Sequence, residues 1–321
     1  EFAFGSKHDP EGNIWVVLGL SGSYHSHNLF RGWAVKVTPD GKMIPVCSGL
    51  RSPAGVAANA EGAMFTIESQ GPWNGSCSLK HLKPGGFLGH PASYNWYPFV
   101  KGMDAPAVEP ESNSRIAIEK KRVKELVPPA VLFPYIKMGR SISGFRLNQT
   151  EGKFGPFENQ FFLGDYTLSL ILRATTEQIN GVWQGACYPF REGLATGIMN
   201  VEFTPKGQLI AGGFTTNRQW PVRGASPYAI QRLEWTGEVP FEIQEINIRP
   251  DGFQLTFTRP VAPEVAVRPK TYVLTTYTHN YSAGYGSPEV DHTTCRVRKA
   301  VVSEDGLRVK LEVDGVQEGH I

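Results

Sequence analysis

The sequence predicts an all-β protein in two parts, a β-propeller over residues 1–237 and an immunoglobulin- or fibronectin-like β-sandwich over 240–321. Three observations support this prediction. The 321 residues include 35 glycines and 24 prolines, which favours many turns over long helices. Short strand–turn–strand units recur in the first part, and the second part alternates apolar and polar residues with a period of two.

The repeating element of the first part is a tight glycine turn between two short apolar strands. Glycine supplies the positive φ that such a turn requires, so the pattern indicates antiparallel hairpins. About four of these units fit between residues 1 and 237, and such a repeat is typical of small sheets arranged radially. The turns lie at residues 9–13, 38–42, 59–62 and 204–207.

The units are interrupted by an insertion at residues 101–140, which we expect to split the third unit. Within it, the segment 116–126 is a candidate for a short helix, although its first residues suit a strand equally well. Pro128-Pro129 ends this segment. The expected units cover 1–47, 48–100, a third that includes 161–175, and a fourth that includes 198–236.

The pattern changes after Gly237. Residues 242–261 alternate around a turn at Asp251-Gly252, and residues 299–313 repeat the hairpin pattern. Strands spaced about ten residues apart suggest a sandwich of two sheets. We expect this sandwich to span 240–321 and to be truncated at its last strand.

Charge and hydropathy exclude several classes of partner. The formal net charge is +2 without a basic block, which argues against a nucleic-acid surface. The dense run at residues 119–122 is expected to be a solvated helix face. No stretch of about 18 apolar residues predicts a membrane span. No signal peptide is visible, and the chain opens inside a strand pattern without Met, so we expect a fragment or a processed chain.

The cysteines give little functional signal. Cys47, Cys77, Cys187 and Cys295 form no C-x-x-C motif, so the zinc, thioredoxin and haem-attachment signatures are missing. Cys47 and Cys77 could pair with each other, or both could be buried free thiols.

Three motifs follow one another between residues 49 and 91, with RSP at 51–53, ESQGP at 68–72 and GGFLGHP at 85–91. In this order they resemble the soluble sugar dehydrogenase superfamily, six-bladed propellers that bind pyrroloquinoline quinone (PQQ) and calcium. The chain looks most like the sugar-dehydrogenase-like propellers of polysaccharide-degrading bacteria, which often carry further modules. The resemblance extends over 1–237 and implies a six-bladed ring that is incomplete in this chain.

The resemblance implies roles for five residues. Arg51 is the catalytic candidate and would place its guanidinium on the cofactor or on substrate oxygens. Ser52 and Gln70 would hydrogen-bond the cofactor. The main-chain carbonyls of Gly71 and Pro72 would coordinate calcium, which would polarise the quinone as a Lewis acid.

The sequence departs from the family in three ways. Ser52 replaces an Asn that would reach the cofactor, and residues 73–76 replace acidic residues. No histidine matches the family's general base, which would then lie upstream of Glu1. These departures concern both cofactor binding and catalysis.

Weaker candidates lie around these motifs. His25 and His27 share one face of an extended segment and could bind a metal or substrate, or form a polar loop at the mouth. Trp73 could stack on a sugar or pack under a long loop. Asp165 could bind substrate or cap a turn. Arg218 could contact cofactor carboxylates or lie on the surface.

The resemblance therefore implies a sugar dehydrogenase-like protein that oxidises a sugar or sugar derivative with PQQ and calcium. It would pass electrons to a cytochrome or another acceptor and work in the periplasm or outside the cell. A non-catalytic carbohydrate-binding or scaffold propeller is the alternative from another class. A propeller hydrolase or lyase acting on polysaccharide is the third, and it would need paired carboxylates.

Overall fold

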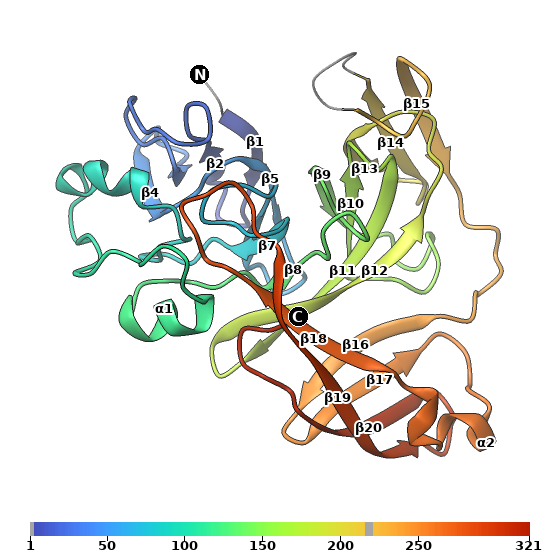
Figure 1. Ribbon diagram of the computed structural model, residues 1–321. Coiled ribbons are helices and arrows are strands. Elements are labelled where there is room, and N and C mark those ends of the chain that lie inside the picture. Colours follow the sequence, from blue (N-terminus) through green and yellow to red (C-terminus); the bar gives the residue numbers. More distant parts are fainter. Residues whose placement is uncertain (1–2, 216–220) are drawn as a thin grey trace.

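Figure 1 shows the computed structural model of the protein, which describes residues 3–215 and 221–321. Within these residues the strands form five antiparallel sheets, and the helices are few and short. The all-β prediction is therefore confirmed. None of the helices in the described part is both long and apolar enough to cross a membrane.

The first four sheets are meanders, in which each strand pairs with the next one along the chain. The turns between their strands contain the predicted glycines, whose φ values are 80° at Gly12, 83° at Gly41, 82° at Gly62 and 79° at Gly207. The hairpin prediction is confirmed at these turns. The strands are β1 (Ala3–His8), β2 (Ile14–Leu18), β3 (Trp33–Val37) and β4 (Met43–Ser48) in the first sheet; β5 (Pro53–Ala58), β6 (Met64–Glu68), β7 (Ser78–His81) and β8 (Val131–Leu132) in the second; β9 (Ile142–Leu147), β10 (Phe161–Asp165), β11 (Leu170–Ile179) and β12 (Val182–Arg191) in the third; and β13 (Ile198–Phe203), β14 (Leu209–Phe214) and β15 (Tyr228–Leu233) in the fourth.

The first strands of these sheets lie side by side in chain order, with β1 beside β5, β5 beside β9, and β9 beside β13. We call them the inner strands. Figure 1 shows the four sheets fanning out from them in an arc. This is the arrangement of propeller blades around an axis.

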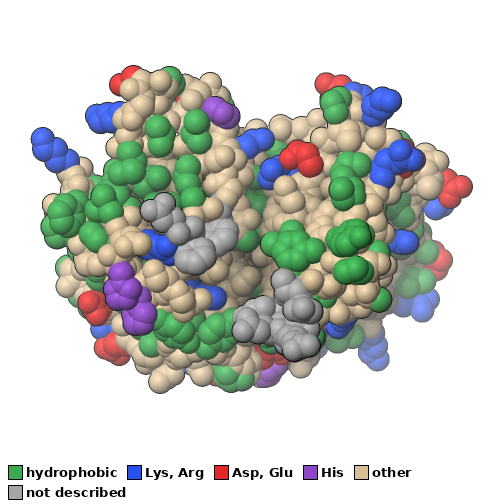
Figure 2. Space-filling model, turned by 90° about the horizontal axis from the view of Figure 1, so that it is seen from above, with side chains coloured by type: hydrophobic (Ala, Val, Ile, Leu, Met, Phe, Trp, Pro, Cys, Tyr) green, Lys and Arg blue, Asp and Glu red, His purple; other side chains and the backbone are tan. Residues whose placement is uncertain are grey.

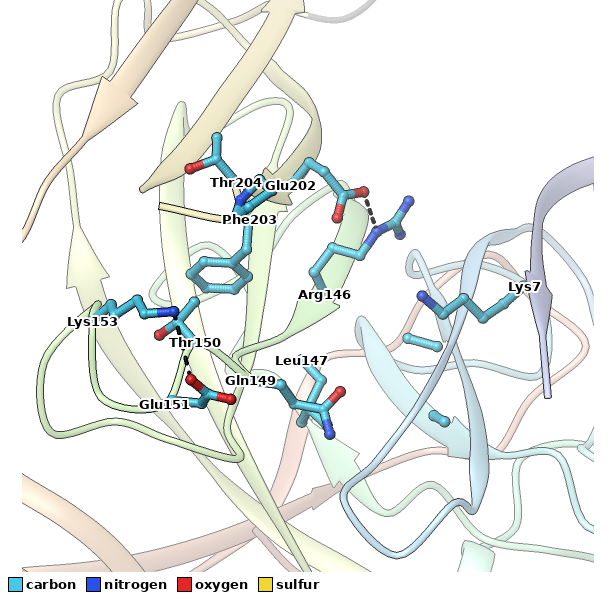
Figure 3. Close-up of a pocket in the computed structure, with 13 residues that line it drawn as sticks. Lys7, Arg146, Leu147, Gln149, Thr150, Glu151, Lys153, Glu202, Phe203 and Thr204 are labelled. Carbon is cyan, nitrogen blue, oxygen red and sulfur yellow. Dashed lines mark hydrogen bonds and ion pairs between the residues drawn. The ribbon is translucent and has the colours of Figure 1, made fainter. Parts of the chain in front are cut away.

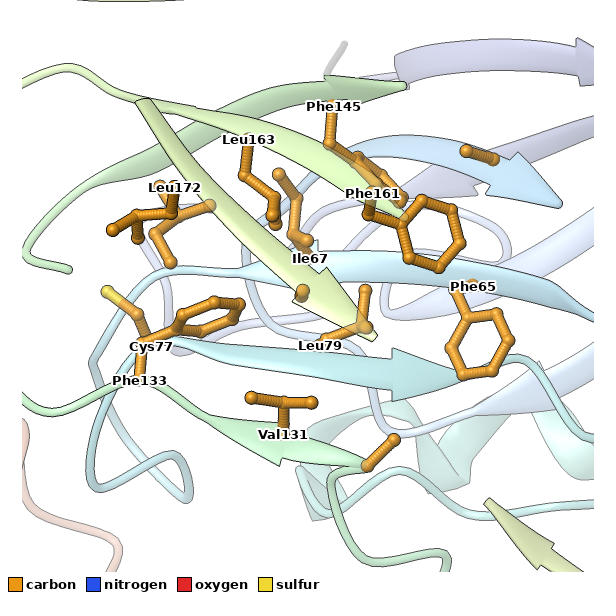
Figure 4. Packing of buried hydrophobic residues seen from close by; sticks show 14 of the residues in the cluster. Phe65, Ile67, Cys77, Leu79, Val131, Phe133, Phe145, Phe161, Leu163 and Leu172 are labelled. Carbon is orange, nitrogen blue, oxygen red and sulfur yellow. The ribbon is translucent and has the colours of Figure 1, made fainter. Parts of the chain in front are cut away.

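Apolar side chains between neighbouring sheets hold the arc together. Between the second and third sheets, Phe161 of β10 meets Phe65 of β6 edge to face, with ring centroids 5.8 Å apart. Phe161 also meets Phe145 of its own sheet at 5.3 Å (Figure 4). The other two interfaces are built in the same way, from Trp15, Val17, Val56 and Leu82 and from Phe162, Ile171, Ile198 and Leu209.

The outer face of the fourth sheet presents large apolar side chains that nothing in the described residues covers. Phe214 pairs with Tyr228, and Ile230 lies two residues further along the same face of β15. Their exposed fractions are 44%, 78% and 82%. An exposed apolar sheet face of this kind favours association.

The insertion lies between β7 and β8, so it splits the second unit and not the third. The reason is the pairing of Leu79 with Val131, which returns the chain to the second sheet. The insertion contains η1 (Pro91–Phe99), which packs on the first sheet, and α1 (Ile116–Arg122), which confirms the short helix. The solvated-face prediction is wrong for Glu119, because its fully buried carboxylate accepts from Arg122 and from the main-chain N–H of Glu111.

The C-terminal part forms one five-stranded antiparallel sheet in the order β16-β17-β20-β19-β18. The helices α2 and η2 pack with the apolar face of this sheet. The predicted two-sheet sandwich is therefore not confirmed. The elements are β16 (Ile243–Arg249), β17 (Gly252–Phe257), α2 (Pro263–Ala266), η2 (Pro269–Thr271), β18 (Leu274–His279), β19 (Glu289–Val302) and β20 (Arg308–Asp314).

The C-terminal sheet also contacts the third sheet of the arc. The main-chain N–H of Ile246 donates to the Tyr188 hydroxyl at 2.7 Å, and that of Ile248 donates to Glu177 at 2.8 Å. All four cysteines are free thiols, so Cys47 and Cys77 do not pair.

Candidate functional site at the mouth of the arc

The inner strands all begin at one end of the arc, which we call the mouth. The loops between the second and third strands of each sheet return to the same end, because neighbouring strands are antiparallel. Figure 2 views the end at which β1 begins and β14 ends, and shows charged and hydrophobic side chains interspersed there. The predicted residues within the described part all lie in these loops or strand ends: His25, His27, Arg51, Ser52, Gln70, Gly71, Pro72, Trp73 and Asp165.

A buried ion pair fixes the start of β5. One oxygen of Glu68 accepts from the main-chain N–H of Arg51 at 2.6 Å and of Ser52 at 3.0 Å. The other oxygen pairs with Lys80 at 2.6 Å, and Lys80 also donates to the Leu88 carbonyl at 3.0 Å. The three motifs at 51–53, 68–72 and 85–91 therefore meet around one carboxylate and one ammonium group.

The guanidinium of Arg51 is buried and most of its donors are engaged. Nη1 donates to the carbonyls of Ser69 at 3.0 Å and Gln70 at 2.5 Å, and Nη2 donates to the Ser23 hydroxyl at 3.1 Å. The ring of Tyr285 lies over the guanidinium, 5.3 Å from it, as in a cation–π contact. With 5% of its surface exposed, Arg51 links the two loops that flank it but offers few free donors.

The turn after β6 is also satisfied internally. The Gln70 amide donates to the Gly75 carbonyl at 3.0 Å. The Gly71 carbonyl accepts twice, from the main-chain N–H of Asn74 at 3.1 Å and of Gly286 at 3.2 Å. A carbonyl oxygen has two lone pairs, so the Gly71 oxygen is fully used.

A loop from the C-terminal sheet covers this turn. We call residues 281–287, between β18 and β19, the cover loop. Trp73 donates its main-chain N–H to the Ser282 carbonyl at 2.7 Å, and its ring meets Tyr281 edge to face with 5.0 Å between centroids. Trp73 therefore packs beneath a loop, which was the alternative to stacking on a sugar.

The two predicted loop histidines are exposed and stack on each other. The ring centroids of His25 and His27 are 5.0 Å apart, with 22° between the ring planes. Among the described residues, no three His, Cys, Asp or Glu side chains gather as a metal site would require. The pair therefore presents rings to the solvent at the mouth.

His90 lies near Arg51 and is held as a neutral ring. Its Nδ1 accepts from the main-chain N–H of Ala92 at 3.2 Å, which leaves the proton on Nε2. Burial, together with the positive charges of Lys80 and Arg51, lowers the pKa of His90 to about 3. The main chain of Ser23 acts in the opposite direction and raises this pKa, but by less. A ring in this tautomer donates at Nε2 and does not serve as a general base there.

The third sheet repeats the arrangement around Arg51. One oxygen of Asp165 accepts from the main-chain N–H of Arg140 at 2.7 Å and of Ser141 at 2.8 Å, and the other accepts from Leu168 at 2.7 Å. Asp165 thus acts as a turn cap, and burial raises its pKa. The half-buried Arg140 side chain has no hydrogen bond or ion pair within the described part of the chain.

Sequence reasoning missed this repeat, although a signal for it exists. The pattern R-S-x-x-G occurs at 51–55 and again at 140–144, in each case at the start of an inner strand. Arg218, the remaining cofactor candidate, lies outside the described residues.

A hollow of about 390 Å³ lies at the opposite ends of the inner strands (Figure 3). Lys7, Arg146 and Glu202 line it, and Arg146 pairs with Glu202 at 2.6 Å. None of the predicted site residues lines this hollow.

Calcium does not fit the carbonyls of Gly71 and Pro72 in this arrangement. Calcium takes about six to eight oxygen ligands, and the Gly71 oxygen is already used twice. The Gln70 carbonyl accepts from Arg51, whose positive charge lies against the same turn. PQQ fits no better here, because its carbonyls and carboxylates need hydrogen-bond donors. The Gln70 amide and both Nη atoms of Arg51 already donate within the chain, and the Arg51 Nε, which has no partner among the described residues, is buried.

Comparisons with known proteins give only distant similarities. No family model matches the chain, and no curated protein matches it. The chain is similar to a putative oxidoreductase (glucose dehydrogenase) of Thermus thermophilus, with a TM-score of 0.46, 17% identity, and coverage of 71% of this chain and 63% of that one. It is also similar to the PQQ-bound aldose sugar dehydrogenase of Streptomyces coelicolor, with a TM-score of 0.46, 17% identity, and coverage of 73% and 62%.

A putative 6-phosphogluconolactonase of Bacteroides uniformis gives a TM-score of 0.34 at 13% identity, covering 99% of this chain and 84% of that one. The chain spans about three fifths of the length of the two dehydrogenases. At these scores the likeness carries no weight for function.

Proposed function

We propose that the mouth binds a sugar or sugar derivative without oxidising it, as a dehydrogenase-like propeller that has kept the shape of the site. The supporting observation is a set of exposed rings on two loops that contact Arg51. Tyr24, 45% exposed, follows Ser23, whose hydroxyl accepts from Arg51, and Tyr285, 51% exposed, lies over the guanidinium.

Exposed rings and free donors suit a sugar. Aromatic faces pack against the apolar faces of sugar rings, while hydroxyl groups need donors and acceptors at the edges. The stacked His25 and His27 extend the ring surface on the Tyr24 side. Arg140, at the start of the neighbouring inner strand, supplies an unengaged guanidinium, which suits a carboxylate or hydroxyl-rich ligand.

The second candidate is a sugar dehydrogenase that uses PQQ and calcium, an oxidoreductase. The meeting of the three motifs around Glu68 and Lys80 favours it. An electron acceptor such as a cytochrome, and a periplasmic or extracellular location, belong to this proposal. No observation favours a hydrolase or lyase, because the buried carboxylates of Glu68 and Asp165 are engaged by main-chain N–H groups and Lys80.

Calorimetric titration tests the sugar proposal. The probes are glucose and a glucose tetrasaccharide, and the variants are Tyr24→Ala and Tyr285→Ala. We expect each variant to weaken binding by about 2- to 10-fold, the range for a lost ring contact. Phe241→Ala, which removes an exposed ring in the linker before β16, should leave the affinity unchanged.

A second titration separates the two candidates. PQQ with calcium is added to the same protein and to Arg51→Ala. Micromolar binding that Arg51→Ala loses would favour the dehydrogenase, and absence of both sugar and PQQ binding would refute both proposals.

A further inference from the structure

We infer that the cover loop occupies the place that the resemblance gives to the quinone and calcium, so the C-terminal sheet is a built-in occupant of the mouth. The carbonyl and amide groups expected to hold a cofactor are engaged by residues of the same chain.

The main chain of the cover loop is docked on the turn after β6. The N–H of Gly286 donates to the Gly71 carbonyl at 3.2 Å, and the Ser282 carbonyl accepts from Trp73 at 2.7 Å. Tyr285 forms an isolated β-bridge with Pro72. The loop therefore satisfies this turn much as a neighbouring strand would.

The side-chain contacts are equally close. The Tyr285 ring lies 5.3 Å from the Arg51 guanidinium. A Cβ atom on Gly286 would lie 2.6 Å from Cδ of Gln70, so the loop backbone rests directly on that amide. A ligand cannot reach Gln70 from this side while Gly286 stays in place.

Two anchors hold the cover loop down. Tyr281 is 5% exposed, and its hydroxyl donates to the Gly89 carbonyl at 2.5 Å. Arg115, which precedes α1, contacts both flanks of the loop. It pairs with Asp291 at 2.5 Å and donates to the Asn280 side chain at 2.5 Å. The loop is thus tied to the insertion between β7 and β8, at Gly89 and just before α1, as well as to its own sheet.

A ligand of the mouth would then bind on top of the cover loop and not beneath it. The exposed half of Tyr285 is available to such a ligand, while the donors under it are not. This inference does not depend on whether a sugar binds, because it concerns what lies against Gln70 and Gly71.

Hydrogen exchange of the intact protein tests the inference. Gly286 has a φ of 69°, which a β-branched residue adopts only with strain, and a Cβ there would press on the buried Gln70 amide, so Gly286→Val should push the loop off the turn. Gly284→Val is the matched control, because a Cβ there would meet only the Ser282 hydroxyl at 3.4 Å. We expect exchange of residues 70–75 to speed up at least tenfold in Gly286→Val and to stay unchanged in Gly284→Val.

PQQ with calcium completes the test. A large excess of PQQ and calcium should leave exchange of residues 70–75 unchanged in the unaltered protein. Protection of β20 in the same data shows that the C-terminal sheet remains folded in each variant. The inference is overturned if Gly286→Val leaves the turn as protected as before, or if the unaltered protein binds PQQ and releases residues 281–287. Loss of sugar binding alone would refute the proposed function and leave this inference standing.

Discussion

Replacing Lys80 with Met is expected to destabilise the protein strongly. Glu68 and Lys80 are 0% and 3% exposed at their side chains, and their charged atoms are 2.6 Å apart. Without Lys80, the Glu68 carboxylate stays buried with only two main-chain N–H partners. Removing one partner of a buried ion pair costs about 3–5 kcal/mol, because the remaining charge is uncompensated.

A double-mutant cycle separates this cause from simple loss of packing. In Glu68→Gln combined with Lys80→Met neither charge remains, and the Gln carbonyl can still accept from Arg51 and Ser52. We expect the double variant to lie within about 2 kcal/mol of the unaltered protein. Arg298→Met, which breaks the exposed pair with Asp314, is the control and should cost less than about 1 kcal/mol.

The assay is urea unfolding followed by circular dichroism, with the free energy of unfolding taken from the midpoint and slope. Two results would refute the reasoning. One is a cost below about 1 kcal/mol for Lys80→Met, which would mean that water or another group solvates Glu68. The other is a double variant as unstable as the sum of the two single ones.

Four further predictions concern other groups. Below about pH 6.5 His90 is protonated in the unfolded chain but stays neutral in the folded protein, where its pKa is about 3. The free energy of unfolding should therefore fall as the pH drops from about 6.5 towards about 3, by up to about 1.4 kcal/mol per pH unit. Urea midpoints at pH 7.5 and 5.0 should show a smaller fall for His90→Asn, and an equal fall would contradict the role given to burial. Asp165→Asn should cost about 1–3 kcal/mol in the same assay, because Asn offers one acceptor oxygen where Asp165 accepts at both, and a cost near zero would show that the caps are dispensable. Burial raises the pKa of Cys77 to about 12 and also raises the pKa of Cys47, so neither thiol should react with iodoacetamide at pH 8 while the protein is folded. Mass spectrometry should find both unalkylated until the protein is unfolded, and rapid labelling would show that the thiols are accessible. Ile230→Lys should reduce self-association in sedimentation velocity without lowering stability, and unchanged sedimentation would mean that this face does not associate.

The sequence predicts well the parts of the fold that local chemistry decides. The turns at Gly12, Gly41, Gly62 and Gly207 are predicted correctly, because glycine tolerates positive φ wherever it stands in the fold. The short helix α1 lies within a segment for which the sequence left helix and strand open, and the buried contacts of Glu119 favour the helix. The misplaced insertion shows the limit, because only the pairing of β7 with β8 reveals which sheet it interrupts.

The candidate site depends more on contacts between distant segments. The sequence placed Arg51, Gln70 and Gly71 at one site, and the structure brings them together at the mouth. The sequence alone could not show that Glu68 pairs with Lys80, because that contact depends on the strand register. Nor could it show that the Gly286 N–H donates to the Gly71 carbonyl, because that contact requires the C-terminal sheet. The sandwich prediction rested on strand spacing alone, which does not distinguish one sheet from two.

The docking of the cover loop also orders events during synthesis. Tyr281 and Gly89, which it hydrogen-bonds, are 192 residues apart in sequence. The turn after β6 therefore cannot reach its final hydrogen bonding until the ribosome has released most of the chain. Until then, the Trp73 N–H and one lone pair of the Gly71 oxygen remain bonded to water. Contacts of such long range form slowly, so we expect the second sheet to be the last part of the arc to become rigid, although it is among the first to be made.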